Sequence, residues 1–309
     1  MAKETELKLR CAIENLPTLM QLLDSIAKPQ RGRQLNNTYY DSHDTALAKA
    51  KAALRIRENQ GQYEQTLKTR GKSVAGLQVR GEWNWPLASA VLDNHLLQQA
   101  EIKQHLPDGL EISQLESIFS TNFKRHTWLY QQNDTQIEVA IDNGEVQTGQ
   151  LRSPLTECEL ELVNGEVELL WQLAQILGKH TPLWISDISK AERGYRLANL
   201  SPSWKEWQAA QQNTEIMLQL EDALVHWQRA LEVIIWEDQP TLTSVAESAL
   251  SQISQLAKQL SFSALTAAIT PWQTVQLSKL NTDLKDNKEL ALSVQKAAFA
   301  FYQLSAAKN

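Results

Sequence analysis

The chain has 309 residues, of which 42% are hydrophobic, and a formal net charge of −6 at pH 7. This length exceeds what one compact domain usually holds, so two domains are expected. The acidic balance argues against a general nucleic-acid or acidic-membrane binder. No stretch is long and apolar enough for a membrane span, and no charged start precedes an apolar run. We therefore expect a cytoplasmic protein with no nucleic-acid or membrane partner.

The first residues alternate between charged and mostly apolar side chains. Glu4, Glu6 and Lys8 share one face of an extended chain, and Leu7 and Leu9 share the other. A period of two is typical of a β-strand whose faces meet different environments. Two explanations fit this strand: an edge strand with a solvated charged face, or a strand whose charges line a polar interior.

Similar patterns predict further elements up to about residue 200. Strands are expected at residues 33–41, 53–58, 62–70, 77–85, 115–131, 135–142 and 155–163. Helices are expected at residues 16–26, 45–51, 89–106 and 166–177. Asn59-Gln60-Gly61 predicts a hairpin turn, and a second turn is expected at Asn143-Gly144. The two cysteines, Cys11 and Cys158, have apolar neighbours on predicted strands, which indicates reduced structural thiols.

Beyond Pro202 the alternation gives way to helical spacing, so we place a boundary between domains 1–200 and 201–309. Apolar stripes follow one another at residues 216–234, 242–260, 272–280 and 290–304. Stripes of this kind predict a small four-helix unit.

Several predicted strands carry charges of a single sign on one face. Arg55 and Arg57 share a face, and so do Glu157, Glu159 and Glu161. Like charges this close repel one another unless opposite charges lie between them. A closed antiparallel barrel with a polar interior brings both sets together. Its carboxylates could then bind a divalent metal, and its arginines and lysines could bind phosphate.

This ordered set of charged strands resembles the CYTH superfamily, the triphosphate tunnel metalloenzymes. Glu4-x-Glu6-x-Lys8 matches the N-terminal signature of that family. The later residues that match its pattern are Arg55 and Arg57, Glu64 and Lys68, Arg80 and Glu82, Arg125, Glu138 and Asp142, Glu159 and Glu161, and Lys190 and Arg193. The resemblance implies an α+β fold, a closed eight-stranded antiparallel β tunnel with peripheral helices, followed here by a small all-α bundle. It also implies dependence on Mg²⁺ or Mn²⁺.

The resemblance implies roles for these charged residues. The expected metal ligands are Glu4, Glu6, Asp142, Glu159 and Glu161. The residues expected to bind the substrate phosphates are Lys8, Arg55, Arg57, Lys68, Arg80, Arg125, Lys190 and Arg193. The residues expected to take part in catalysis are Glu4, Glu6, Lys8, Glu138 and Lys190. Glu138 or Asp142 is either a metal ligand or the group that orients the attacking water, and Glu64 and Glu82 hold cations in place. Arg125, rather than its neighbour His126, is expected to face the interior.

The two-domain layout resembles bacterial CYTH–CHAD proteins, which implies hydrolysis of inorganic triphosphate to pyrophosphate and phosphate. The alternatives are a class IV-type adenylate cyclase, a hydrolase of thiamine triphosphate or a nucleotide, and a non-catalytic module that binds polyphosphate. Residues 201–309 hold 8 Lys/Arg, 11 Asp/Glu and one histidine, His226, unlike a basic CHAD domain. We expect a short CHAD-like bundle with a structural or partner-binding role.

Overall fold

Eight antiparallel strands form a closed barrel in the computed structural model, which describes residues 2–69, 71–200, 215–237, 240–275, 277 and 282–307. Around the barrel the strands are β1 (Ala2–Arg10), β10 (Leu151–Asn164), β9 (Thr135–Thr148), β8 (Glu116–Gln132), β3 (Arg33–Asp41), β4 (Ala53–Asn59), β5 (Gln62–Lys68) and β7 (Leu77–Leu87). Pairing of β7 with β1 closes the ring. The short strands β2 (Lys28–Pro29), β6 (Lys72–Val74) and β11 (Trp184–Ile185) pair at its margins. The predicted tunnel fold is confirmed.

Alternation along the strands separates a charged interior from an apolar exterior. On β1, Glu6 and Lys8 point inward and are only 2% and 1% exposed. Leu7 and Leu9 point outward and are fully buried in a hydrophobic core. Because both faces of β1 are buried, the solvated edge strand is ruled out.

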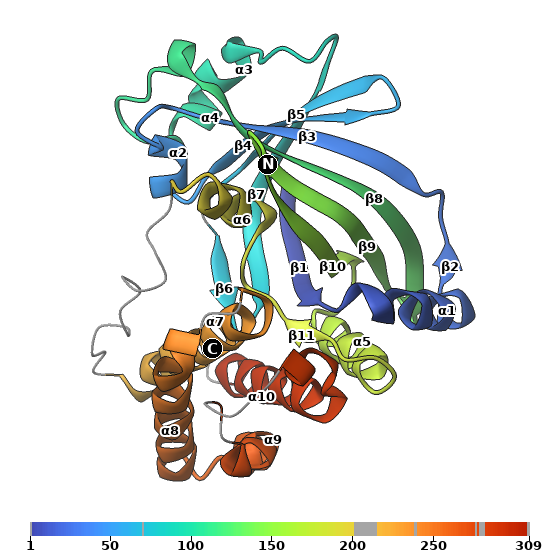
Figure 1. Ribbon diagram of the computed structural model, residues 1–309, viewed down its shortest axis with the longest axis vertical. Helices are drawn as coiled ribbons and strands as arrows, with labels where there is room; N and C mark the ends of the chain where they lie inside the picture. The colour runs from blue at the N-terminus through green and yellow to red at the C-terminus, as the bar shows by residue number, and fades with distance from the viewer. Residues whose placement is uncertain are drawn as a thin grey trace.

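Helices cover the outside of the barrel in two places (Figure 1). α1 (Leu16–Ile26) and α5 (Glu168–Gly178) share a core with β1, β9 and β10. The free cysteines Cys11 and Cys158 lie in this core, which confirms two buried thiols. On another side, α2 (Ala46–Lys49), α3 (Asn94–Gln98) and α4 (Ala100–Lys103) enclose a second core around Leu67 and Trp83.

The C-terminal helices α7 (Ile216–Glu237), α8 (Thr243–Gln259), α9 (Ser263–Ile269) and α10 (Lys288–Ala306) form a bundle at one end of the barrel (Figure 1). Short 3₁₀ turns span Ile13–Asn15, Ile112–Gln114, Pro240–Leu242, Thr270–Thr274 and Thr282–Asp286. The bundle shares the core of α1 and α5, and the Trp171 ring of α5 lies 6.1 Å from Phe299 of α10. A helical bundle after the barrel is confirmed, whereas the boundary near Pro202 lies outside the described residues. None of the described helices could cross a membrane.

Three predicted element boundaries are wrong. β9 continues through Asn143-Gly144 to Thr148, since its pairing with β8 continues past these residues. A Cβ on Gly144 would lie 2.1 Å from the carbonyl oxygen of Asn122. Glycine is thus needed there for close approach of two strands, not for a turn. The expected helix at residues 89–106 is the pair α3 and α4, broken at Gln99, whose ψ is 136°. The third apolar stripe, at residues 272–280, forms no α-helix over its described residues. α9 ends at Ile269, and a 3₁₀ turn follows at Thr270–Thr274, where Pro271 cannot donate a helical hydrogen bond.

Candidate active site

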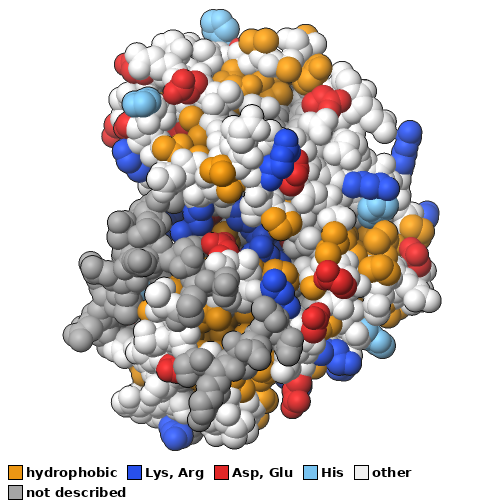
Figure 2. Space-filling model, viewed as in Figure 1, with side chains coloured by type: hydrophobic (Ala, Val, Ile, Leu, Met, Phe, Trp, Pro, Cys, Tyr) orange, Lys and Arg blue, Asp and Glu red, His pale blue; other side chains and the backbone are white. Residues whose placement is uncertain are grey.

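The barrel interior opens into a cavity of about 1170 Å³ with a charged wall. The predicted site residues that line it are Glu4, Lys8, Arg55, Arg57, Lys68, Arg80, Glu82, Arg125, Glu159, Glu161 and Lys190. In the space-filling view, lysine and arginine side chains gather in a hollow near the middle of this face (Figure 2). The strand residues in this set occupy inward-facing positions, so charges from distant parts of the sequence meet in one cavity.

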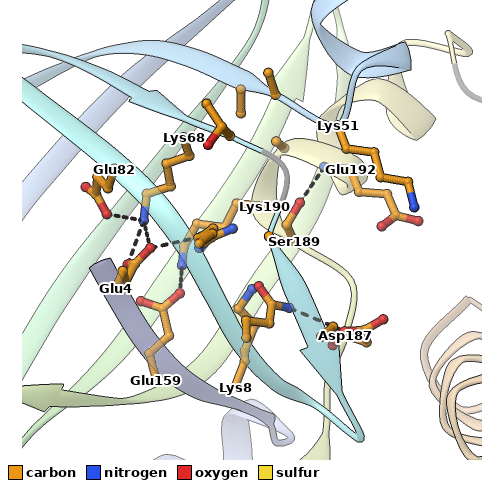
Figure 3. Close-up of a pocket in the computed structure, with 18 of the residues that line it drawn as sticks. Glu4, Lys8, Lys51, Lys68, Glu82, Glu159, Asp187, Ser189, Lys190 and Glu192 are labelled. Carbon is orange, nitrogen blue, oxygen red and sulfur yellow. Dashed lines mark hydrogen bonds and ion pairs between the residues drawn. The ribbon is translucent and has the colours of Figure 1, made fainter. Parts of the chain in front are cut away.

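β1, β5 and β7 bring a first group of charges together (Figure 3). Lys68 Nζ lies 2.7 Å and 2.9 Å from the two carboxylate oxygens of Glu4, and 3.0 Å from Glu82. Arg80 donates to Glu4 at 2.9 Å and to Glu6 at 2.7 Å. Burial alone would raise the pKa of Glu4, but Lys68 and Arg80 outweigh burial and lower it. Glu82 thus pairs with Lys68 in the wall of the cavity.

A second group surrounds Lys190, the first residue of α6 (Lys190–Leu197). Its ammonium lies 2.8 Å from both Asp142 and Glu159 and also contacts Glu157. Arg125 makes two hydrogen bonds of 2.7 Å to Asp142 and one of 2.6 Å to Glu159. Burial opposes the charge on Lys190, but the three carboxylates outweigh burial and raise its pKa. The placement of Arg125 inside the barrel is confirmed.

One carboxylate in the cavity, Glu161, has no cation in ion-pair contact among the residues that the structure describes. Burial and the nearby charges of Glu4, Glu6 and Glu159 raise its pKa to about 7, although Lys68 opposes the shift. A carboxylate whose pKa is raised by burial and by acidic neighbours has room for added positive charge beside it.

The opposite imbalance is found on β4. Arg55 and Arg57 make no ion pair within the described part of the chain. Arg57 donates to Asn37 at 2.9 Å, and Arg55 hydrogen-bonds to Tyr39. Burial, Arg55 and Arg125 lower the pKa of Arg57 to about 9. Two adjacent arginines that repel each other in this way have the chemistry to bind an anion between them.

Residues 2–195 match the family model described as the CYTH domain. The chain belongs to the CYTH domain family. An inorganic triphosphatase from Haemophilus influenzae is 37% identical to it over 201 residues, which are 64% of this chain and 56% of the relative. The chain thus spans little more than half the length of that curated relative.

Solved structures resemble the CYTH barrel more distantly. A Hippeastrum protein described as having a dominant triphosphatase activity is 21% identical, with a TM-score of 0.47, and the match covers 62% of this chain and 95% of that one. A protein from Pyrococcus horikoshii is 17% identical, with a TM-score of 0.39, over 57% and 89% of the two chains.

Some predicted residues of the CYTH barrel lie outside this cavity. Glu64 and Glu138 make no ion pair among the described residues, and neither lines the cavity. Asp142 lies behind the wall, where it is fully buried against Arg125 and Lys190. Arg193 faces away from the cavity, toward residues of α7 and β10.

Two residues of the site received no role from the sequence. Glu157 shares the charged face of β10 but contacts Lys190, a residue 33 positions later. Tyr39 lines the cavity, and its pKa is lowered because Arg55 and Lys190 outweigh its burial. Its inward parity on β3, shared with Asn37, is the signal that could have identified it.

Proposed function

We propose that this protein hydrolyses inorganic triphosphate to pyrophosphate and phosphate, with a divalent ion, Mg²⁺ or Mn²⁺, as cofactor. The observation that carries the proposal is the pair of unmatched charges in one cavity. Among the residues that the structure describes, Glu161 has no cation and Arg55 and Arg57 have no carboxylate at ion-pair distance. A metal–triphosphate complex supplies both. The 37% identity to an inorganic triphosphatase supports the same substrate.

The cations free of ion pairs form the proposed phosphate site. Within the described part of the chain, Lys8, Arg55 and Arg57 reach the cavity without contacting a carboxylate at ion-pair distance. Arginine binds phosphate oxygens through two parallel hydrogen bonds, whereas lysine acts as a point charge. Arg125 and Lys190 face the same space, held at fixed positions by Asp142. We assign these five residues to the substrate phosphates.

The carboxylates suited to a metal ion are Glu161 with Glu4, Glu6 and Glu159. Carboxylate oxygens are the hard ligands that Mg²⁺ and Mn²⁺ prefer. A second acidic group, Asp142, Glu157 and Glu159, has oxygens within 4.8 Å of one another, but the Lys190 ammonium already contacts all three residues. This contact supports a positioning role for Asp142 and Glu157. A divalent ion, when bound, supplies neutralisation of the phosphate oxygens.

The protein must also align the substrate phosphates with the attacking water. Phosphoryl transfer depends mainly on positioning and on charge stabilisation around the transferred group. Salt bridges fix Lys68 and Arg80 on one side and Arg125 and Lys190 on the other. We keep Glu138 as a candidate for orienting the attacking water. The cytoplasmic location, the lack of nucleic-acid and membrane partners and a protein partner of the bundle also stay predictions.

The test compares inorganic triphosphate with ATP in the presence of Mg²⁺ or Mn²⁺, measuring phosphate and cyclic AMP. Phosphate release from triphosphate without cyclic AMP is expected. Cyclic AMP formation would favour the cyclase alternative, and turnover of neither substrate would favour a binding module. Glu159→Gln should abolish turnover with the fold retained, and Glu247→Gln on the exposed side of α8 is the matched control.

A further inference from the structure

Helix α7 of the C-terminal bundle contacts the segment that carries Lys190. Arg229 of α7 lies 3.3 Å from Asp187, which precedes Lys190, and also contacts Glu192, which follows it. Arg229 lines the cavity too. Figure 3 shows Asp187 and Glu192 on the side of the cavity where Ser189 caps the start of α6. One side chain of the bundle thus bridges both flanks of a site lysine.

Glu232 lies three residues after Arg229, so the two share one face of α7. The Glu232 carboxylate accepts hydrogen bonds from Ser186 at 2.8 Å and from Arg193 at 3.2 Å. It also lies 3.4 Å from Arg10, the last residue of β1. The Glu232 side chain is only 1% exposed, and a buried charge of this kind persists only when it is paired.

The contacts continue from Glu232 into the site. Arg193 lies between Glu232, at 3.2 Å, and Glu157, at 3.7 Å. Glu157 in turn contacts the ammonium of Lys190. A series of alternating charges therefore runs from α7 through α6 and β10 to the wall of the cavity.

α6 needs external support because it has only eight residues, and isolated helices so short are unstable in water. Its other side packs on the barrel, where a Cβ on Gly194 would lie 2.1 Å from the ring of Phe119. The helix is thus held between the barrel and α7. The apolar side of α7 has its own anchors, since Leu224, Trp227 and Leu231 are buried in the bundle core.

We propose that Arg229 and Glu232 are positioning residues that set α6 so that Lys190 reaches the substrate phosphates. The bundle then helps to position a residue of the tunnel site. This inference rests on the proposed function, because Lys190 is assigned to the substrate there. Misplacement of a reacting group by 1 Å costs about 10²-fold in rate. A shift of α6 should therefore be visible in turnover.

The test is a double-mutant cycle with Lys190→Met. Arg229→Met and Glu232→Gln should each lower kcat/KM for triphosphate by roughly 10- to 100-fold in the wild-type background. The same changes should have less than about a twofold effect in Lys190→Met, because the group that they position is gone. Arg229→Met should disturb folding less than Glu232→Gln, because the Arg229 side chain is 15% exposed and the Glu232 side chain is only 1% exposed. Lys258→Met and Glu247→Gln, both exposed on α8, are matched controls and should leave kcat/KM unchanged.

The same cycle is measured by calorimetric binding of inorganic triphosphate in EDTA, so that it does not depend on turnover. If Arg229→Met or Glu232→Gln lowers affinity and kcat/KM equally in the wild type and in Lys190→Met, the inference is overturned while the proposed function stands. Binding without hydrolysis in the wild type would refute the proposed function and leave the binding cycle to decide the inference. If the wild type neither binds nor hydrolyses triphosphate, both are wrong.

Discussion

Glu161→Gln is expected to change how stability depends on pH in the metal-free protein. The pKa of Glu161 is about 7 in the folded state, against 4.5 for an unperturbed glutamate. Folding therefore takes up a proton at Glu161 between these values, so the contribution of Glu161 to stability is greatest below about pH 4.5 and is lost as the pH rises through 7. At 1.36 kcal/mol per pKa unit the shift corresponds to about 3 kcal/mol, and solvent screening of this half-buried group lowers the cost of the ionised carboxylate to about 2–3 kcal/mol at pH 8.5. Glutamine, which is neutral at every pH, avoids this cost.

The assay is urea denaturation in EDTA at pH 5 and pH 8.5, for the wild type and for Glu161→Gln. Other titrating groups contribute to both proteins, so the difference between the two curves isolates Glu161. The variant should gain about 2–3 kcal/mol over the wild type at the higher pH and little at the lower one. Mg²⁺ added at pH 8.5 should stabilise the wild type more than the variant. Parallel pH profiles for the two proteins would refute the assigned environment of Glu161.

Three further changes test single contacts. Arg125→Met should lower the free energy of unfolding by about 3–5 kcal/mol, because it removes two hydrogen bonds from the fully buried Asp142; an unchanged urea midpoint would contradict this pairing. Gly144→Ala should lower the free energy of unfolding by more than about 2 kcal/mol. Gly32→Ala is the control, because its Cβ would meet its nearest atom at 3.5 Å, and it should change that free energy by less than about 0.5 kcal/mol. Equal melting temperatures for the two variants would contradict the close approach at Gly144. Tyr195→Phe should lower the free energy of unfolding by about 1–2 kcal/mol, because the Tyr195 hydroxyl donates a hydrogen bond to the buried Asp41 at 2.7 Å. Thermal melting of the two proteins measures this loss.

The sequence predicts much of the barrel because β-strands have a simple period. Alternation placed Lys8 and Leu7 on opposite faces, and it required that Arg125 and His126 face opposite ways. The same rule placed Glu159 and Glu161 together on one face of their strand. The parity of one strand separates its two faces, and the like charges of several strands, with the family resemblance, indicated which face is interior.

Features that depend on two elements could not be predicted in this way. Gly144 resembles a turn residue until β9 is paired with β8 and the approach of Asn122 becomes visible. Glu157 acquires its role from Lys190, which reaches it from a helix rather than from a neighbouring strand. Glu232 looks like an ordinary helical glutamate, and only the docking of α7 on the barrel buries it. Local patterns say nothing about which helix face meets the barrel.

The core shared by α5, β11 and α10 bears on how the chain can be synthesised and divided. Trp184 of β11 donates to the carbonyl of Lys285 at 3.0 Å, and Gln295 of α10 donates to the carbonyl of Leu183 at 2.7 Å. A ribosome that has released the whole barrel sequence must translate about a hundred more residues before these partners exist. Until then Trp171 of α5 and Trp184 of β11 lack the C-terminal side chains that they pack against. The cooperative folding unit is therefore longer than the region that defines the family, and a fragment cut after α6 would be prone to aggregate.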